Sequence, residues 1–373
     1  MKTIILLLLL ACGANAQSTL YQYLTMGKYP VGFQTFYEYD ASRPAVREQK
    51  EQTKGRFLQI NIWYPATKKE GKVLTFKDFV DLSGKELDEN SATNEQATLK
   101  AYLDWNGIAD TARQDFITYL EKNQSLYTRL NAPVKAGNFP VVLLMHGSAA
   151  TYAFMGAYLA SQGYFVVQVP VKGTAAYELD YQLEAKGLET QIIDYEYAIN
   201  FIKQRFPYLD YNQVAVAGLS FGGQSAVGLA IRHANIKAVI SLDGGIGSDF
   251  GGTLLSRQSF YDINKIKAPI LHLYNPNDPY TDLQWLKKYN AAHRTLVAFN
   301  NVEHQHFSAF GLLQKEISND VTAKALQTST AYEAILWYTQ TFLDQHLKNK
   351  SNKMMQLSKK AWVKSAVHSF NRL

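Results

Sequence analysis

Short apolar segments that alternate with helical patterns constrain the fold of this 373-residue chain more than any other feature. Between several of them lie apolar residues at helical spacing, such as Tyr195, Ala198 and Ile202. Continuous apolar strands that alternate with amphipathic helices are typical of a parallel sheet covered on both faces. After Pro140 the apolar segments are Val141–Met145, Tyr164–Val169, Gln213–Ala217, Ala238–Leu242, Ile270–Tyr274 and Thr295–Phe299.

The part of the chain before Pro140 has a different character. Val31–Tyr39 and Phe57–Tyr64 are rich in β-branched and aromatic residues and flank a charged loop, which predicts an antiparallel pair of strands. From Lys77 to Leu130 the sequence is polar and helix-forming, which predicts a helical insertion that acts as a lid or as a covering layer. We therefore expect an α/β fold over residues 17–347, with a mostly parallel, doubly wound sheet.

One serine lies in a turn that is suited to chemistry. The segment Gly218-Leu219-Ser220-Phe221-Gly222 directly follows an apolar strand and opens a helical stretch, which is the context of the Gly-x-Ser-x-Gly nucleophile motif. Glycines on both sides of such a strained turn let the strand and the helix approach without Cβ clashes. The turn lifts the Ser220 hydroxyl above the edge of the sheet and directs the Phe221 backbone N–H toward a developing oxyanion. Ser220 is therefore the candidate nucleophile.

A serine hydroxyl is a poor nucleophile, so a carboxylate and a histidine base must follow it in the chain. His233 and His272 fall inside a predicted helix and a predicted strand, where histidines commonly serve packing. His304 and His306 lie in the loop that follows the apolar run ending at residue 299. That loop is expected at the catalytic edge of the sheet, and geometry alone does not separate the two histidines.

Four segments carry a resemblance to known proteins. They are Phe139-Pro140-Val141-Val142 leading into His146-Gly147, the Ser220 motif, Ser241-Leu242-Asp243-Gly244, and His304-Gln305-His306-Phe307. With them the sequence resembles the α/β-hydrolase superfamily, and within it the platelet-activating-factor acetylhydrolases, dienelactone hydrolases and polyester-hydrolase-like enzymes. The resemblance covers roughly residues 139–347. The acetylhydrolases carry a similar His-Gln-x-Phe segment, which implies that His304, rather than His306, is the general base.

Two aspartates compete for the role of the acid that orients the histidine. Asp278 follows a strand and a turn, as in the common hydrolase pattern, although Asn275 replaces the usual glycine. Asp243 ends the preceding strand, where the acetylhydrolase branch has its acid. The sequence favours Asp278 only slightly, and both remain candidates.

The oxyanion of an acyl-transfer reaction needs a second backbone donor beside Phe221. His146-Gly147-Ser148 follows the first strand of the parallel region. In the relatives named above, the residue after His-Gly supplies a backbone N–H to the oxyanion, which implies this role for Ser148. His146 itself is expected to be structural.

The predicted activity is that of a serine carboxylic-ester hydrolase that works through an acyl-enzyme intermediate. Its substrate would be a small-molecule or lipid-like ester. A peptidase or acyltransferase on the same fold, or a catalytically silent binding protein, remains as an alternative. Activity toward peptides alone would favour a peptidase. Failure of Ser220 to react with a fluorophosphonate would favour a binding protein without catalytic activity.

No organic cofactor or metal is expected. The third glycine of Gly245–Gly251 falls one residue late for a dinucleotide loop, and Glu303-His304-Gln305-His306 lacks the helical spacing of zinc proteases. The single cysteine excludes a disulfide within the chain and a zinc site built from several thiolates. The formal charge is +6, but the basic residues are mostly dispersed. Nucleic-acid recognition needs a concentrated basic face, so the net charge alone is a weak argument for a nucleic-acid partner.

The two ends of the chain carry separate signals. Lys2, an apolar run from Ile4 to Leu10 and Ala14-Asn15-Ala16 predict a secretory signal peptide over residues 1–16. Leu9-Leu10-Ala11-Cys12 also resembles a lipoprotein signal, in which Cys12 would carry a lipid. We expect a secreted or periplasmic protein without a transmembrane span. The basic segment 348–373 is expected to be a solvated tail or a terminal helix.

Overall fold

The structure of the chain is a computed structural model. The residues that it describes are 21–43, 45–47, 50–52, 55–86, 95–105, 108, 110–121, 127–171, 184–249, 251–289, 293–317, 323–351, 354 and 359–372. The predicted signal peptide, with Cys12, lies outside these residues. Across the described ranges, no helix has both the length and the apolarity needed to cross a membrane.

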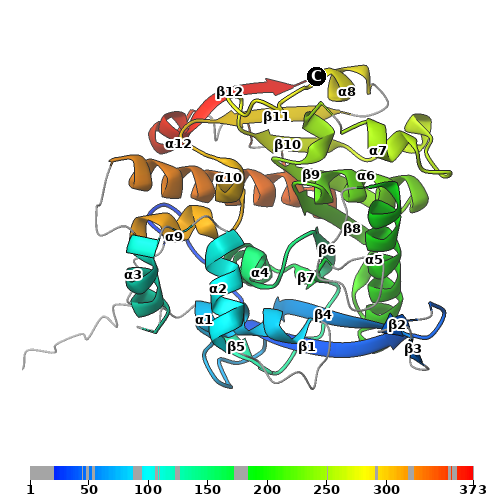
Figure 1. The fold of residues 1–373 in the computed structure, drawn as a ribbon. Coiled ribbons are helices and arrows are strands. Elements are labelled where there is room, and N and C mark those ends of the chain that lie inside the picture. The colour runs from blue at the N-terminus through cyan, green and yellow to red at the C-terminus, as the bar shows by residue number, and fades with distance from the viewer. Residues whose placement is uncertain are drawn as a thin grey trace, which may run out of the picture.

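A ten-stranded sheet runs through the molecule in the order β12-β11-β10-β9-β8-β6-β7-β4-β1-β5. Figure 1 shows its strands following one another from β12 at the top of the view to β1 at the bottom. A separate hairpin consists of β2 and β3. The strands are β1 (Val31–Asp40), β2 (Ala45–Arg47), β3 (Lys50–Gln52), β4 (Arg56–Pro65), β5 (Thr128–Leu130), β6 (Pro140–Met145), β7 (Phe165–Gln168), β8 (Asp210–Leu219), β9 (Ile236–Leu242), β10 (Ile270–Tyr274), β11 (Arg294–Phe299) and β12 (Val367–Arg372).

The centre of the sheet is parallel, and antiparallel pairs flank it on both sides. Strands β7, β6, β8, β9, β10 and β11 pair in parallel. β1 and β4 form a long antiparallel ladder from Val31–Pro65 to Asp40–Arg56, and β4 pairs antiparallel with β7. These pairings confirm the predicted α/β architecture with its N-terminal antiparallel pair.

Helices cover both faces of the sheet. Successive side chains of a strand point to opposite faces, and in the central strands the side chains on both faces are apolar and buried. In β6, Val142 and Leu144 pack into one buried core, whereas Val141, Leu143 and Met145 pack into the other. The first core includes residues of α4, α9 and α10, and the second includes residues of α5 and α6. The helices are α1 (Phe76–Leu82), α2 (Glu95–Trp105), α3 (Asp110–Glu121), α4 (Ala153–Ser161), α5 (Ala185–Arg205), α6 (Gly222–Arg232), α7 (Thr253–Ser256), α8 (Gln284–Lys288), α9 (Phe310–Ile317), α10 (Ala323–Leu347) and α12 (Ala361–Ala366).

The segment in which the sequence predicts a helical insertion contains α1, α2 and α3. Thr75 begins α1 with a capping box, in which its hydroxyl accepts the Asp78 N–H and the Asp78 carboxylate accepts the Thr75 N–H. Phe76 at the start of α1 stacks on Phe154 of α4, with ring centroids 5.5 Å apart. This packing joins the insertion to the helical layer on one face of the sheet.

The sequence predicts a solvated tail or a terminal helix for the basic C-terminal segment, and its described residues include a helix, α12, followed by a strand. Val363 and Ala366 of α12 are buried, and Trp362 stacks on Trp337 of α10 and on Tyr23. After α12 the chain continues into β12, which pairs antiparallel with β11 and forms the last strand of the sheet. Backbone hydrogen bonds to an open edge need no particular side chains, so residue types alone do not predict this strand.

Candidate active site

Ser220 lies in a strained turn between β8 and α6. Its φ of 55° is in the left-handed region, which non-glycine residues rarely adopt. The neighbouring glycines are required by space, because a Cβ on Gly218 would lie 2.0 Å from the Gly222 carbonyl oxygen. A Cβ on Gly222 would lie 2.4 Å from the Met145 carbonyl oxygen. The turn that the sequence motif predicts is therefore present, and Ser220 lines a cavity at its tip.

His304 and Asp243 reach the same cavity from two other strands. His304 begins the short helix η5 (His304–Phe307), which follows β11, and Asp243 directly follows β9. The His304 Nδ1 lies 2.7 Å from the Asp243 Oδ2. A carboxylate can only accept, so this bond puts the proton on Nδ1 and leaves Nε2 with a lone pair. The second Asp243 oxygen, Oδ1, accepts the Asn275 backbone N–H at 2.9 Å, which fixes the carboxylate plane.

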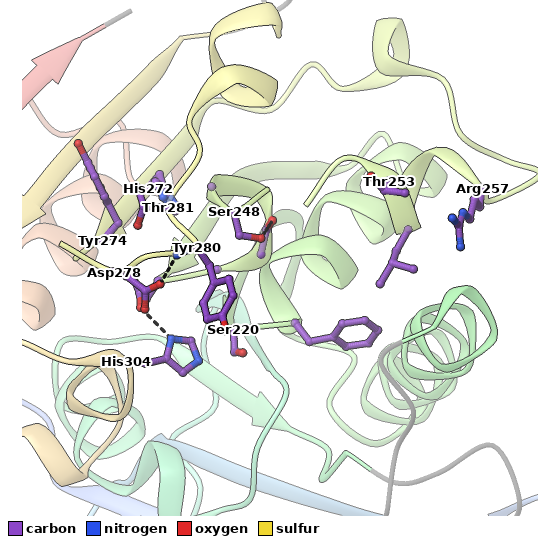
Figure 2. A pocket seen from close by; sticks show the side chains of 16 residues that line it. Ser220, Ser248, Thr253, Arg257, His272, Tyr274, Asp278, Tyr280, Thr281 and His304 are labelled. Carbon is purple, nitrogen blue, oxygen red and sulfur yellow. Dashed lines mark hydrogen bonds and ion pairs between the residues drawn. The ribbon is translucent and has the colours of Figure 1, made fainter. Parts of the chain in front are cut away.

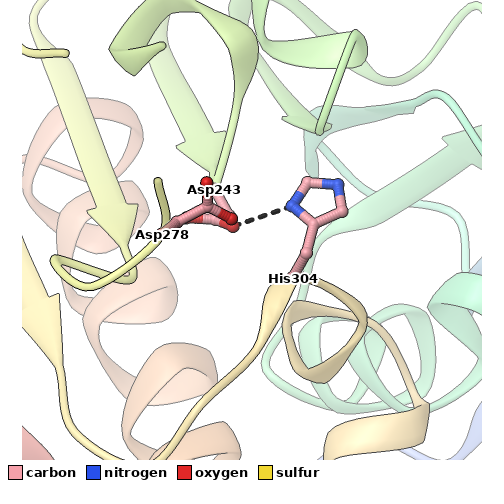
Figure 3. A group of neighbouring side chains, drawn as sticks. All are labelled: Asp243, Asp278 and His304. Carbon is pink, nitrogen blue, oxygen red and sulfur yellow. Dashed lines mark hydrogen bonds and ion pairs between the residues drawn. The ribbon is translucent and has the colours of Figure 1, made fainter. Parts of the chain in front are cut away.

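Asp278 lies beside this pair without the same contact. Figure 3 shows both carboxylates on one side of the His304 ring, and one ligand atom from each of Asp243, Asp278 and His304 lies within 4.8 Å of the others. The Asp278 Oδ1 instead accepts the Tyr280 backbone N–H at 2.8 Å, as turn aspartates commonly do. The sequence pattern slightly favours Asp278 as the orienting acid, whereas in the structure the hydrogen bond from the histidine goes to Asp243.

The two carboxylates raise the pKa of His304. Desolvation at the cavity wall acts to lower this pKa, but the hydrogen bond to Asp243 and the negative charges of Asp243 and Asp278 outweigh it. The net shift is upward from the ordinary value of 6.5. The His304 imidazole therefore binds a proton more readily than a histidine in free solution does.

His306 has a different environment from its neighbour. It is 1% exposed, and its Nδ1 accepts the Glu303 backbone N–H at 2.8 Å. Burial lowers the pKa of His306 to about 4, so the ring stays neutral and keeps this acceptor at neutral pH. The contact holds the turn from which His304 projects. The geometry therefore separates the two histidines that the sequence alone could not.

Of the two predicted oxyanion donors, Phe221 and Ser148, only Phe221 lines the cavity, next to Ser220. The Ser148 N–H, however, donates to the Thr151 Oγ1 at 3.0 Å within its own turn, beside Gly147 with a φ of 103°. In this conformation the Ser148 amide is used locally, so the role that the resemblance implied for it has no support from the geometry.

The cavity has a volume of about 580 Å³ and opens at the carboxyl edge of the parallel strands. Figure 2 shows Ser220 between His304 on one side and Thr253 and Arg257 on the other. No residue of α1, α2 or α3 that the structure describes lines it. The lining residues are Ser220, Phe221, Asp243, Gly244, Gly245, Gly247, Ser248, Thr253, Leu254, Arg257, His272, Tyr274, Asp278, Tyr280, Thr281 and His304.

Several of these residues were not singled out in the sequence. Thr253, Leu254 and Arg257 come from α7 and its C-terminal cap, in the long connection between β9 and β10. That connection carries no motif, and only its position after the strand bearing Asp243 hinted that it borders the site. The glycine-rich segment from residue 245 borders the site, since Gly245 and Gly247 line the cavity.

Within the described ranges, Asp243, Asp278 and His304 are also the one group of side chains arranged so that a metal ion could bind. Two carboxylates and an imidazole are donors that a divalent cation accepts. The His304 Nδ1 is already occupied by its bond to Asp243, so a metal would have to break this pair.

Part of the chain is similar in sequence to chlorophyllases. A family model described as chlorophyllase matches residues 118–255. Chlorophyllase type 0 from Chenopodium album is 28% identical over 125 residues, which are 32% of this chain and 36% of that protein. The chain thus matches only about a third of the length of this curated relative.

A solved structure is similar over nearly the whole chain. It is a ferulic acid esterase from Streptomyces cinnamoneus, with a TM-score of 0.62 and 17% sequence identity. The alignment covers 93% of this chain and 98% of that one, which shows a common fold. Together with the parallel sheet and the serine turn between β8 and α6, these similarities show that the chain belongs to the α/β-hydrolase superfamily.

Proposed function

We propose that the protein is a serine hydrolase of carboxylic esters, with Ser220 as the nucleophile, His304 as the general base and Asp243 as the orienting acid. The observation that carries the proposal is the shared cavity. Three strands bring the three side chains to one opening, in the chain order Ser, Asp, His that is usual for this fold. The named similar proteins, a chlorophyllase and a ferulic acid esterase, also favour an ester substrate.

The proposed reaction has two steps. His304 Nε2 takes the proton of the Ser220 hydroxyl while Oγ attacks the ester carbonyl carbon, and the proton then passes to the departing alcohol oxygen. In the second step His304 draws a proton from water while the water oxygen attacks the same carbon. The bond from this carbon to the Ser220 Oγ then breaks, the proton passes from His304 to Oγ, and the acid is released. Asp243 keeps the Nδ1 proton in place and stabilises the imidazolium that forms in each step. The Phe221 N–H is the proposed donor to the oxyanion.

Turnover of 4-nitrophenyl esters by the purified protein and three variants tests this proposal. Ser220→Ala should abolish turnover and labelling by a fluorophosphonate. Asp243→Asn should lower kcat by about 10⁴-fold, because the wrong histidine tautomer is then favoured. Asp278→Asn should lower it far less. The reverse order of the two aspartate variants would transfer the role of the acid to Asp278.

Assays of the same proteins with peptides, and with an alcohol added to the ester assay, separate the alternative functions. Activity confined to peptides would indicate a peptidase, and transfer of the acyl group to an added alcohol in preference to water would indicate an acyltransferase. If the folded protein neither turns over esters nor reacts with the fluorophosphonate, the proposal is wrong, and a binding protein without catalytic activity is favoured.

We further propose that the protein is exported, on the strength of residues 1–16 alone. Expression of the full chain in a bacterial host should give a mature protein that begins at Gln17. A mature chain that begins at a lipid-modified Cys12 would instead indicate a lipoprotein, and an uncleaved chain in the cytoplasm would contradict export.

A further inference from the structure

The cavity is polar at both ends and apolar between them. One end contains Ser220, His304 and the two carboxylates, and the other contains Arg257 and the Thr253 hydroxyl (Figure 2). The apolar side chains of Phe221 and Leu254, which directly follow Ser220 and Thr253 in the chain, also line the cavity. A substrate that fills the cavity would therefore meet the reacting serine, then an apolar wall, and then a cation.

The proposed chemistry fixes which half of an ester faces that cation. The departing alcohol oxygen must take its proton from His304, so the alcohol half lies on the His304 side of Ser220. Arg257 lies on the other side of Ser220 in Figure 2. The acyl half is left with the space along Phe221 and Leu254 toward Arg257.

Among the residues that the structure describes, Arg257 lacks the acidic partner that several other arginines have. It is exposed, and within the described part of the chain it has no acidic partner at salt-bridge distance and no ring contact. An arginine without a partner presents a planar fork of donors that matches a carboxylate. By contrast, Arg43 and Arg56 pair with Asp194, Arg113 with Asp104, and Arg232 with Glu196.

Apart from His304, Arg257 is also the one cationic side chain among the residues that line the cavity. An anionic group on the acyl half would meet this positive charge and the Thr253 hydroxyl, far from the negative charges of Asp243 and Asp278. An anion on the alcohol half would instead meet those two carboxylates and be repelled.

We infer that the protein selects esters whose acyl half ends in a carboxylate, such as half-esters of dicarboxylic acids, and that Arg257 binds this carboxylate. The inference rests on the proposed function and specifies the substrate class for it. The carboxylate takes no part in the covalent steps, which remain attack by Ser220 and release by water.

The test compares two series of 4-nitrophenyl esters of matched length. One series is the monoesters of adipic and suberic acids, and the other is the hexanoate and the octanoate. The measured quantity is the ratio of kcat/KM for the half-ester to kcat/KM for the neutral ester. The variants are Arg257→Gln, Arg257→Lys and, as a control, Lys237→Gln, which removes an exposed positive charge at the far end of β9.

Arg257→Gln should lower the ratio by about fivefold, the size expected for an ion pair at an exposed site. Arg257→Lys should keep most of the ratio, and Lys237→Gln should not change it. Added NaCl should lower the ratio in the wild type, because salt screens an exposed pair. An unchanged ratio in Arg257→Gln, or the same loss in Lys237→Gln, would overturn the inference.

Binding measurements test the carboxylate subsite at Arg257 without relying on ester turnover. If no ester is turned over in a Ser220-dependent way, the proposed function fails, and the subsite is then tested by saturation-transfer NMR. Monomethyl adipate should bind the Ser220→Ala protein better than methyl hexanoate does. The same preference in Ser220→Ala with Arg257→Gln would contradict a role for Arg257.

Discussion

Two carboxylates act on one imidazole at the centre of the site, but they act differently. Asp243 is 7% exposed in its side chain and hydrogen-bonds the His304 Nδ1, so it can set the tautomer. Asp278 contributes through its charge, which helps to raise the pKa of His304. A residue that acts only through charge changes the pH range of activity more than the maximal rate.

The pH dependence of kcat/KM should reflect this division. The base must be neutral, so activity should rise with pH through the pKa of His304, with its midpoint above 6.5 in the wild type. Asp278→Asn removes one of the charges that raise this pKa and should move the midpoint to lower pH. Rate profiles of both proteins between pH 5 and 9 measure the shift. An unmoved midpoint would show that Asp278 does not act on His304.

The sequence narrowed the acid to these two aspartates and could not go further. Asp243 and Asp278 follow the adjacent strands β9 and β10, so both reach the same edge of the sheet. The choice depends on where each side chain points. Asp243 adopts a φ of 44° and accepts the Asn275 N–H, and neither fact can be read from residue types.

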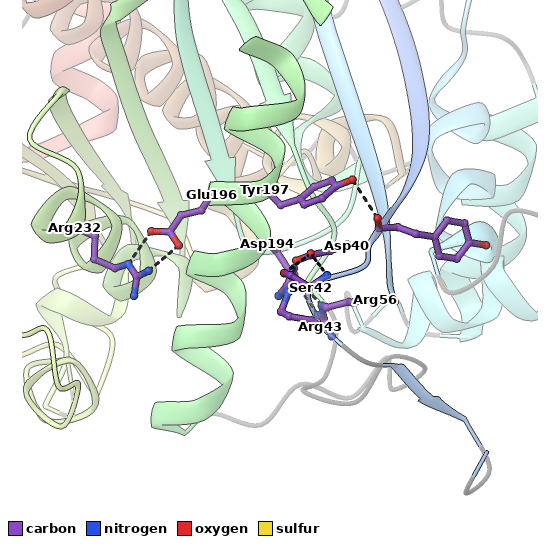
Figure 4. Close-up of polar contacts among 9 residues, drawn as sticks. Asp40, Ser42, Arg43, Arg56, Asp194, Glu196, Tyr197 and Arg232 are labelled. Atoms are coloured by element: carbon purple, nitrogen blue, oxygen red, sulfur yellow. Dashed lines mark hydrogen bonds and ion pairs between the residues drawn. The ribbon is translucent and has the colours of Figure 1, made fainter. Parts of the chain in front are cut away.

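At the scale of elements, a buried ion pair joins the sheet to a covering helix. Arg56 on β4 donates from Nε and Nη2 to the two oxygens of Asp194 on α5, both at 2.8 Å (Figure 4). Each side chain is 3% exposed, and Arg43 adds a second contact to Asp194 at 2.8 Å. Removal of one partner from such a pair leaves a buried charge without compensation.

Asp194→Ala should therefore lower the free energy of unfolding by about 3–5 kcal/mol. A control lies on the same helix, where Glu196 pairs with Arg232 in a more exposed setting. Glu196→Ala should cost about 1 kcal/mol or less. Urea unfolding of the three proteins measures both values. Equal losses in the two variants would indicate that burial of the Asp194 pair carries no special cost.

The accuracy of the predicted elements depended on how each one is stabilised. The central strands were found because burial on both faces demands continuous apolar residues, as in β6 and β10. β12 is largely exposed and polar, and it joins the sheet through its backbone, so it left no such pattern. The short strand β5 was missed for the same reason.

At the scale of the whole molecule, buried neutral histidines are distributed over the sheet edge and the loops around the site. His146, His272 and His306 are each at most 3% exposed. Burial lowers the pKa of His146 to about 3 and the pKa of His272 and His306 to about 4. All three therefore remain uncharged in the folded protein at pH values where they would be protonated in the unfolded chain.

This difference should make the fold sensitive to mild acid. Below pH 6.5 the unfolded state binds more protons, so stability that is complete at higher pH is lost progressively as pH falls toward 4. At pH 5 the loss is about 2 kcal/mol for each of the three histidines. Burial also lowers the pKa of the partly exposed His346 to about 4, which adds to the loss, whereas the raised pKa of His304 offsets part of it.

Urea unfolding at pH 7.5 and pH 5.0 tests this expectation. The wild type should lose about 4–6 kcal/mol between the two conditions, a large share of the stability of a typical domain. His272→Asn cannot titrate, so the loss in this variant should be smaller by about 2 kcal/mol. His368→Asn, at an exposed position on β12, serves as the control. If His272→Asn and His368→Asn lose as much stability as the wild type, the buried histidines do not cause the acid sensitivity.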